Sequence, residues 1–493
     1  MNPLKKLASE AGLYGLPSIL GRLLNYLLVP LHTAVFFPSQ FGDVTILYTY
    51  VAFLNITLTF GMETAFFRFT TKSQSSDYYH YTFTIVLLIS LFISGLAFLN
   101  APALNIFFSL AADSLIIKYL SVIILIDAIV AIPLAKLRLE GKAAKFAFIR
   151  LSGIILTVVL NYAFLEVLPA LAKKGWLNWP NKYPMDIEFV FLANLLANSI
   201  MLPLLFREFL GVRLNISLSK LKKLLNYGGP IFLMGLAGML VEGFDKTGIF
   251  EYFLPADFYE KYSAEAAFGI YSAAFKLSIF MALAVQAFRY AGEPFFFSRA
   301  SDKQSPELFA KVLYYFVWLA IIIWVGVSLN TDLIGEIFIR GKSAYKEALY
   351  LVPILLLGKL FFGIYINLSI WFKITDKTYY GIFMSLLGSV VVIITNILLI
   401  PYLGYLGCAI ASVLAYFAMV IYCYITGQKH FKIPYPVIKI VRNLTLAGLI
   451  IAVYYFFKPE RLWLNYTLGI VITVIFITGV ILFERKRIFS ERL

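Results

Sequence analysis

Apolar residues dominate the chain in runs of about 20, and short polar segments separate the runs. About 20 helical residues, rising 1.5 Å each, cross a hydrocarbon core about 30 Å thick. The runs are continuous rather than alternating, which favours helices over the roughly 10-residue strands of a membrane barrel. The pattern predicts an all-α polytopic membrane protein with about 14 transmembrane helices.

The first six expected spans are residues 12–34, 44–67, 81–101, 115–135, 146–168 and 186–206. Six more are expected at residues 226–249, 266–288, 308–329, 349–372, 380–400 and 404–426. A final pair is expected at residues 437–457 and 462–483.

Composition and charge agree with a membrane location. Hydrophobic residues make up 61% of the chain and charged residues only 14%, which excludes an ordinary soluble globular protein. The net charge of +15 could indicate nucleic-acid binding, but most basic residues fall in alternate connections. The positive-inside rule then predicts cytoplasmic termini and no nucleic-acid partner. These basic segments, which also attract anionic lipid, include Lys136, Arg138, Lys142, Lys145 and Arg150, then Arg213, Lys220, Lys222 and Lys223, and finally Arg485, Lys486 and Arg487.

The start of the chain and the cysteines add little chemistry. Lys5 and Lys6 precede an apolar run that is long and contains Pro17 and Arg22, so we expect a retained first span rather than a cleaved signal peptide. Cys408 and Cys423 both fall inside expected spans, and no disulfide framework is implied.

Two correspondences indicate an internal repeat. Tyr14-Gly15-Leu16-Pro17 and Tyr227-Gly228-Gly229-Pro230 open the first and seventh spans. At one constant interval along the chain, Arg138, Lys142 and Asn161 correspond to Lys373, Lys377 and Asn396. Six spans per repeat predict two parallel lobes, residues 1–212 and 213–432, followed by a last helix pair and basic tail at 433–493. Such transporters place the substrate between the lobes.

Ionisable residues inside the expected spans are the candidates for chemistry, since each costs about 2.5 to 3.5 kcal/mol at the bilayer centre unless it faces protein or water. They are Arg22, Asp127, Lys276 and Lys359 near mid-span, and Glu242, Asp245 and Lys246 towards the end of the seventh span. These residues either clamp helices together or line a hydrated cavity, and a local pair between Glu242 and Lys246 is one option.

The cations in this set suit an anionic headgroup such as a pyrophosphate or an acidic sugar, because Arg and Lys both bind phosphate. The candidate headgroup-binding residues are Arg22, Lys246, Lys276 and Lys359. The carboxylates Asp127, Glu242 and Asp245 could bind a coupling H⁺ or Na⁺. Near the cytoplasmic ends of spans two and eight, Glu63 with Arg68 and Arg289 with Glu293 could form a gate or anchor the interface.

Enzyme chemistry has little support. There is no HExxH motif, and His32, His80 and His430 are widely separated. The segment from Gly335 to Ser343 is one residue too long for a P-loop. A membrane glycosyltransferase or polymerase would usually carry catalytic carboxylates on a large loop, whereas the longest connections here have only about 20 residues by the span assignment. We expect no enzyme activity, metal or cofactor beyond a coupling ion.

Several motifs resemble one family. They are Pro38-Ser39-Gln40-Phe41-Gly42, Phe60-Gly61-Met62-Glu63 with Arg68, Asp245-Lys246, the segment from Gly269 to Lys276, Gln286 to Arg289 with Pro294-Phe295, and Asn396 to Pro401 with Gly404 and Gly407-Cys408-Ala409. The chain resembles Wzx-like oligosaccharide flippases of the multidrug/oligosaccharidyl-lipid/polysaccharide exporter superfamily. Gln40, Phe41 and Cys408 depart from the usual pattern.

The resemblance implies two six-helix lobes plus two helices. It further implies ion-coupled alternating access that carries an undecaprenyl-pyrophosphate-linked repeat unit of O-antigen, capsule or exopolysaccharide across a bacterial inner membrane. Membrane lipid and polysaccharide polymerase or assembly proteins are the implied partners. A lipid II-type flippase, a multidrug exporter, a membrane glycosyltransferase or polymerase, and a non-transporting scaffold remain alternatives.

Overall fold

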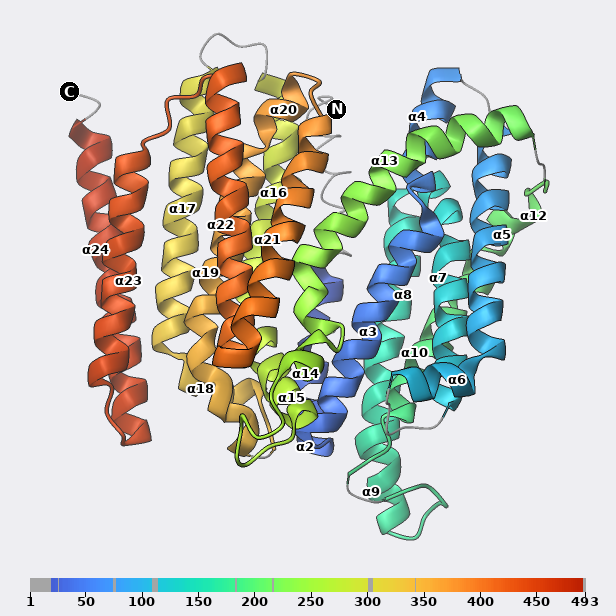
Figure 1. The fold of residues 1–493 in the computed structure, drawn as a ribbon, viewed down its shortest axis with the longest axis horizontal. Coiled ribbons are helices and arrows are strands. Elements are labelled where there is room, and N and C mark those ends of the chain that lie inside the picture. The colour runs from blue at the N-terminus through green and yellow to red at the C-terminus, as the bar shows by residue number, and fades with distance from the viewer. Residues whose placement is uncertain are drawn as a thin grey trace.

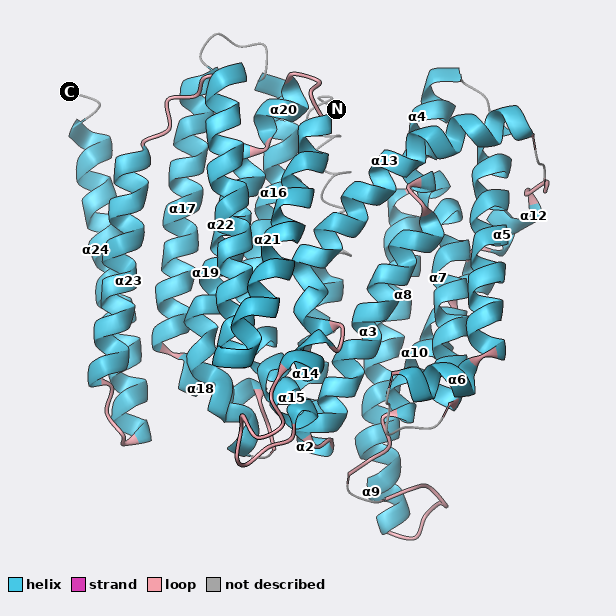
Figure 2. Ribbon diagram, viewed as in Figure 1, coloured by secondary structure: helices cyan, strands magenta, loops and turns pink. Residues whose placement is uncertain are grey.

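The computed structural model describes residues 19–24, 26–73, 77–108, 114–181, 184–214, 217–299, 305–341 and 343–490. Every regular element in these ranges is helical, as Figure 2 shows. The sequence expectation of an all-helical membrane fold is therefore confirmed. The motif at residues 14–17 lies outside the described residues.

The helices are numbered in chain order and coloured from blue at the N-terminus to red at the C-terminus in Figure 1. Those before residue 213 are α2 (Leu28–Val35), α3 (Pro38–Thr59), α4 (Met62–Ser73), α5 (Asp77–Leu99), α6 (Ala101–Phe107), α7 (Leu115–Leu139), α8 (Ala143–Tyr162), the π-helix η1 (Ala163–Val167), α9 (Leu168–Lys173), α10 (Glu188–Ser199), α11 (Met201–Leu204) and α12 (Phe206–Leu210). Those after it are α13 (Leu218–Gly243), η2 (Phe244–Lys246), α14 (Ile249–Phe253), α15 (Ala264–Lys276), α16 (Ile279–Arg299), α17 (Ser305–Leu329), α18 (Thr331–Phe338), η3 (Ser343–Leu351), α19 (Val352–Leu368), α20 (Ile370–Ile374), α21 (Tyr379–Leu403), α22 (Tyr405–His430), α23 (Val437–Phe457) and α24 (Leu462–Ser490).

Eleven helical segments of the described chain are long and apolar enough to cross a membrane, and a bent pair, Ala264–Lys276 with Ile279–Phe297, raises the number to twelve. This pair turns by 46° at the expected eighth span. Two shorter apolar helices, Ile19–Val35 and Glu188–Leu204, lie where the first and sixth spans are expected. The expected number of about 14 is reached only if both of these also cross the membrane.

Two groups of helices lie side by side, and α13 passes from one to the other (Figure 1). Near its start, Gly228 packs against the backbone of Phe60, where α3 ends. Further along, the Ala237 carbonyl accepts a hydrogen bond from the Ser389 hydroxyl of α21, at 2.7 Å. Pro230 lies between these contacts and interrupts the helical hydrogen bonds. The last two helices, α23 and α24, pack against α17 at the edge of the second group.

The same turn recurs in the two halves of the chain. Gly141, between α7 and α8, and Asp376, between α20 and α21, both adopt left-handed backbone conformations, with φ of 70° and 58°. The amides of Lys142 and Lys377 each donate to the carbonyl five residues earlier, at 2.9 Å in both cases. This hydrogen bond and the left-handed residue are the marks of a Schellman helix end. The corresponding basic pairs of the sequence therefore occupy equivalent turns.

The helices that follow the two turns also match. Asn161 and Asn396 are fully buried, and each donates its amide to the backbone carbonyl four residues earlier, at 2.8 Å. Gly153 and Gly388, separated by the same interval as the two asparagines, each face a methionine of a neighbouring helix. These shared details support a duplication of the helical unit.

The two groups of helices contact each other where α3 crosses α15, at the opposite end of the molecule from the end of α24 (Figure 1). Gly42 of α3 packs against the backbone of Glu265, and Gly269 of α15 packs directly on the Pro38 carbonyl. On each helix the two contact residues are four positions apart, Pro38 and Gly42 on α3 and Glu265 and Gly269 on α15. Each glycine therefore packs against the backbone of the other helix. We call it the α3–α15 crossing. Small residues allow this close approach of two backbones.

Candidate functional site

A partly buried ion pair joins three helices of the second group. Lys359 on α19 forms an ion pair with Glu242 on α13, and the Tyr416 hydroxyl of α22 donates to the other Glu242 oxygen at 2.9 Å. The Lys359 side chain is 8% exposed, whereas that of Glu242 is 43% exposed. The carboxylate therefore lies at the border of an accessible space, with its charge compensated by a buried amine.

A second pair lies one turn further on. Lys246 donates to the Asp245 carboxylate at 2.8 Å and to the backbone carbonyl of Glu242 at 2.9 Å. The Tyr271 hydroxyl of α15 donates to the other Asp245 oxygen at 2.5 Å. The side-chain pair between Glu242 and Lys246 that the spacing allowed does not form, because the helix tightens into a 3₁₀ turn at residue 244 and Asp245 takes the amine instead.

Lys276 and Arg22 are the cations of this region that have no hydrogen bond or ion pair to any described residue. Lys276 ends α15, at the bend of the expected eighth span, and lies within electrostatic range of Lys246 and of His32 on α2. Arg22 is exposed and lies within range of Lys359. The ring of Phe275 separates the paired lysines, with its centroid 3.7 Å from the Lys246 amine and 5.3 Å from that of Lys359.

We call Arg22, Glu242, Asp245, Lys246, Lys276 and Lys359 the junction cluster. It contains more cations than carboxylates, and its excess positive charge lies on Lys276 and Arg22, where the two groups of helices meet. The sequence identified all six residues, and the structure brings them within electrostatic range of one another. The sequence did not identify Tyr271 and Tyr416, because a tyrosine in an aromatic-rich span carries no distinguishing signal.

Asp127 lies apart from the junction cluster, inside the first group of helices. Its two carboxylate oxygens accept hydrogen bonds from the amides of Asn55 on α3, at 3.3 Å, and Asn198 on α10, at 2.9 Å. The nearest cation is Arg150 on α8, which lies within electrostatic range but forms no ion pair with it. Arg150 was expected among the topology-determining residues, and in the structure it also lies within electrostatic range of this mid-span carboxylate.

The expected gate residues have other partners. Glu63 forms an ion pair with Arg138 of α7, and Arg68 lies over the ring of Tyr227, 4.5 Å from its centroid. Glu63 and Arg68 are five residues apart and therefore lie on different faces of α4. Arg289 on α16 is exposed. Glu293 is on the same helix, and its side chain lies outside the described residues.

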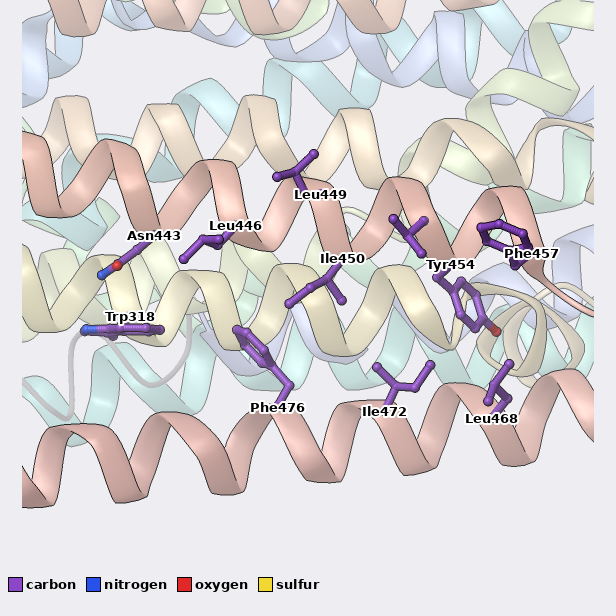
Figure 3. A pocket seen from close by; sticks show the side chains of 11 residues that line it. Trp318, Asn443, Leu446, Leu449, Ile450, Tyr454, Phe457, Leu468, Ile472 and Phe476 are labelled. Carbon is purple, nitrogen blue, oxygen red and sulfur yellow. The ribbon is translucent and has the colours of Figure 1, made fainter.

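An apolar groove runs along the edge helices (Figure 3). It has a volume of about 530 Å³. Apart from the amide of Asn443 at one end, the labelled lining consists of aliphatic and aromatic side chains. The residues are Trp318 from α17, Asn443, Leu446, Leu449, Ile450, Val453, Tyr454 and Phe457 from α23, and Leu468, Ile472 and Phe476 from α24. Such a surface suits hydrocarbon.

Solved structures share this fold. A lipid II flippase MurJ in an inward closed conformation superposes with a TM-score of 0.72 at 15% identity, covering 97% of this chain and 99% of that chain. An inward-facing multidrug resistance MATE family transporter of the MOP superfamily gives 0.63 at 14% identity, covering 86% and 96%. An outward-facing MATE transporter gives 0.56 at 14% identity, covering 90% and 99%. A comparison with curated protein sequences found no match.

A sequence profile described as polysaccharide biosynthesis protein matches residues 35–338, more than half of the chain. The match begins just before α3 and ends with α18, so it includes Asp127 and all of the junction cluster except Arg22 and Lys359. The fold is that of the lipid II flippase MurJ and of the MATE transporters. The chain belongs to the polysaccharide biosynthesis protein family and has the fold of the MOP superfamily exporters.

Proposed function

We propose that this protein carries a polyprenyl-pyrophosphate-linked oligosaccharide from the cytoplasmic to the outer leaflet of a bacterial inner membrane, by alternating access of a site between two lobes. The family supports a role in polysaccharide assembly, and the fold supports transport. The observation that carries the substrate class is the unpaired Lys276 at the lobe junction. An amine without a carboxylate partner inside a span needs water or an anionic ligand.

In this proposal the lobes are residues 1–212 and 213–432, and residues 433–493 add a peripheral pair of helices. The turns and asparagines that recur at a constant interval support the duplication. Counting the shorter helices Ile19–Val35 and Glu188–Leu204 and the bent pair as spans gives fourteen crossings, which keeps both termini on the cytoplasmic side. The α3–α15 crossing then closes the external side.

Within the junction cluster, Arg22 and Lys276 contact the pyrophosphate directly, since no described residue forms a hydrogen bond or ion pair with either. Lys246 and Lys359 are neutralised by carboxylates and contribute chiefly to the local potential. Carrying a charged saccharide through hydrocarbon unaided would cost many kcal/mol in lost hydration, and a polar junction removes most of that barrier. The groove along α17, α23 and α24 suits the lipid chain, which remains in the membrane.

Asp127 is the carboxylate we assign to ion coupling. Glu242 and Asp245 are each paired with a lysine, whereas Asp127 is held only by neutral amides. A carboxylate without a paired cation exchanges H⁺ or Na⁺ at lower cost than one in an ion pair. Binding and release of that ion would be linked to movement of the headgroup, and the pair of Glu63 with Arg138, together with Arg68, Arg289 and Glu293, would form the cytoplasmic gate.

The test is translocation of a fluorescent polyprenyl-pyrophosphate oligosaccharide in proteoliposomes that contain the purified chain, with empty liposomes as control. Imposed gradients of H⁺ and Na⁺ in separate experiments identify the coupling ion. We expect protein-dependent movement that one gradient accelerates. Failure to move several such headgroups, with gradient-driven efflux of a cationic dye, would make the protein a drug exporter. The cationic junction disfavours that outcome, because it repels cationic drugs.

A further inference from the structure

Arg150 is an exposed side chain on the packed face of a helix. Along α8, Phe146, Gly153 and Thr157 are buried at offsets of −4, +3 and +7 from Arg150, which is the spacing of one helical face. The exposed apolar residues Phe148, Ile155 and Val159 lie on the opposite face, at 62%, 50% and 54% exposure. Arg150 is nevertheless exposed. Its side chain therefore reaches an accessible space inside the protein rather than lipid.

The guanidinium of Arg150 has no hydrogen-bond acceptor or ion-pair partner among the described residues. The carboxylates in electrostatic range are Asp127 and Glu63, and both are engaged elsewhere. Each Asp127 oxygen accepts from an asparagine amide, and Glu63 is paired with Arg138. Five N–H donors in a planar fork thus remain for water or a ligand, and this geometry matches phosphate.

We propose that Arg150 is a further headgroup-binding residue, through which the first lobe holds a phosphate of the substrate, and that Asp127 competes with that phosphate for it. This inference rests on the function proposed above. Lys276 and Arg22 then bind the headgroup at the junction, and Arg150 binds it from α8. Two cationic contacts on separate helices would fix the orientation of a pyrophosphate better than a single one.

The competition links the coupling ion to the substrate. An ionised Asp127 attracts Arg150 and lowers the positive potential available to phosphate, whereas a protonated or Na⁺-bound Asp127 does not. The other groups facing the two residues are Arg138 and Glu63, which pair with each other, and the neutral side chains of Tyr48, Asn55 and Asn198. Occupation of Asp127 by a cation and of Arg150 by an anion therefore favour each other, and the linkage is reciprocal.

The experiment measures direct binding of a fluorescent short-chain polyprenyl diphosphate to the purified full-length chain in detergent, from pH 5.5 to 8.5. We expect Arg150→Gln to weaken binding about tenfold or more, since a charge-assisted hydrogen bond contributes about 1.5 to 3 kcal/mol and 1.4 kcal/mol is tenfold. Arg150→Lys should lose less. Arg207→Gln, an exposed arginine on α12 of the same lobe, is the matched control and should bind like the wild type.

Binding of the same diphosphate to Asp127→Asn is the second test, because misfolding would lower the affinity and not raise it. It should tighten binding several-fold at pH 7.5 and flatten the pH dependence. Unchanged affinity in a folded Arg150→Gln protein, with weakened binding in Lys276→Gln, would overturn the role of Arg150 and leave the proposed function intact. If Arg150→Gln does not fold, absence of the gain in Asp127→Asn overturns the inference. If the wild-type protein neither binds the diphosphate nor translocates the oligosaccharide, the proposed function itself is wrong.

Discussion

At the residue scale, the charges inside the spans divide into paired and unpaired groups. Lys359 with Glu242 and Lys246 with Asp245 are compensated within the protein, and a tyrosine hydroxyl completes each pair. Lys276 has no such partner among the described residues. Paired charges stabilise a defined packing of helices only while both partners remain, whereas an unpaired one is a cost to the fold that a ligand can offset.

Replacing Glu242 by Gln should therefore destabilise the protein, because the buried Lys359 amine loses its counter-charge. We expect a loss of about 1 to 3 kcal/mol, below the ~3–5 kcal/mol of a fully buried pair because Glu242 is partly accessible. Thermal unfolding in detergent measures the change. The double variant Glu242→Gln with Lys359→Met should recover part of the loss, and a double variant less stable than the single one would contradict the pairing.

Lys276→Gln should lower translocation about tenfold or more with little loss of stability, since no described protein group depends on this amine. Lys276→Arg retains the charge and should be milder. Transport of the fluorescent lipid-linked oligosaccharide in proteoliposomes is the readout. Lys429→Gln, an exposed lysine at the end of α22, is the control. Full transport by Lys276→Gln would exclude this residue from headgroup binding.

At the element scale, the short helix α14 brings carboxylates together beside the α3–α15 crossing. Glu251 lies on α14, within electrostatic range of Glu265 on α15 and Asp43 on α3. One oxygen of Glu251, Oε1, is buried without a hydrogen bond. Burial first, and then these two neighbouring carboxylates, raise the pKa of Glu251 to about 7 from its ordinary value of 4.5.

The raised pKa of Glu251 predicts a pH-dependent stability. The folded chain holds this proton more tightly than the unfolded chain, so its contribution is full below about pH 4.5 and is lost as the pH rises through about 7. Melting temperatures measured between pH 4.5 and 8 should fall with rising pH, and less steeply in Glu251→Gln. Asp257→Asn, at an exposed carboxylate of the same connection, should keep the wild-type slope. Equal slopes in all three proteins would refute this assignment.

At the scale of the whole molecule, the two groups of helices meet at the α3–α15 crossing. Backbone packs against backbone there, at Gly42 and Gly269. On the proposed topology this state is closed to the outside. Alternating access requires this contact to separate.

Gly269→Ala should weaken the crossing, because the added methyl group would overlap the Pro38 carbonyl, and a backbone cannot move aside cheaply. Labelling of a Phe41→Cys reporter by a membrane-impermeant maleimide should increase, since Phe41 is 2% exposed beside the crossing. The native Cys408 and Cys423 are both buried. Gly95→Ala, where no atom lies within 4 Å, is the control. Unchanged labelling and melting temperature would show that the crossing accommodates the added methyl group and does not depend on this close backbone contact.

The positions of the spans could be predicted from the sequence, but the geometry of the candidate site could not. The continuous apolar runs predicted where helices lie. The bounds match at Val437–Phe457, whereas the seventh span begins at Leu218 rather than at residue 226. The bend at Lys276 and the 3₁₀ turn at Asp245 were not predicted, because both depend on packing between helices. The proximity of Arg150 to Asp127 was not predicted either, because it depends on how α7 and α8 pack against each other.

The sequence by itself determined that the chain is a helical membrane protein and which residues carry charge inside it, because helix length and hydrophobicity are local properties. Only the tertiary structure decided the partners: Lys359 meets Glu242 across 117 positions of the chain, and Asn198 meets Asp127 across 71. No periodicity encodes such pairs, because they depend on which helix faces cross. Within the described chain, that crossing leaves Lys276, Arg22 and Arg150 unpaired, and these three residues carry the proposed site.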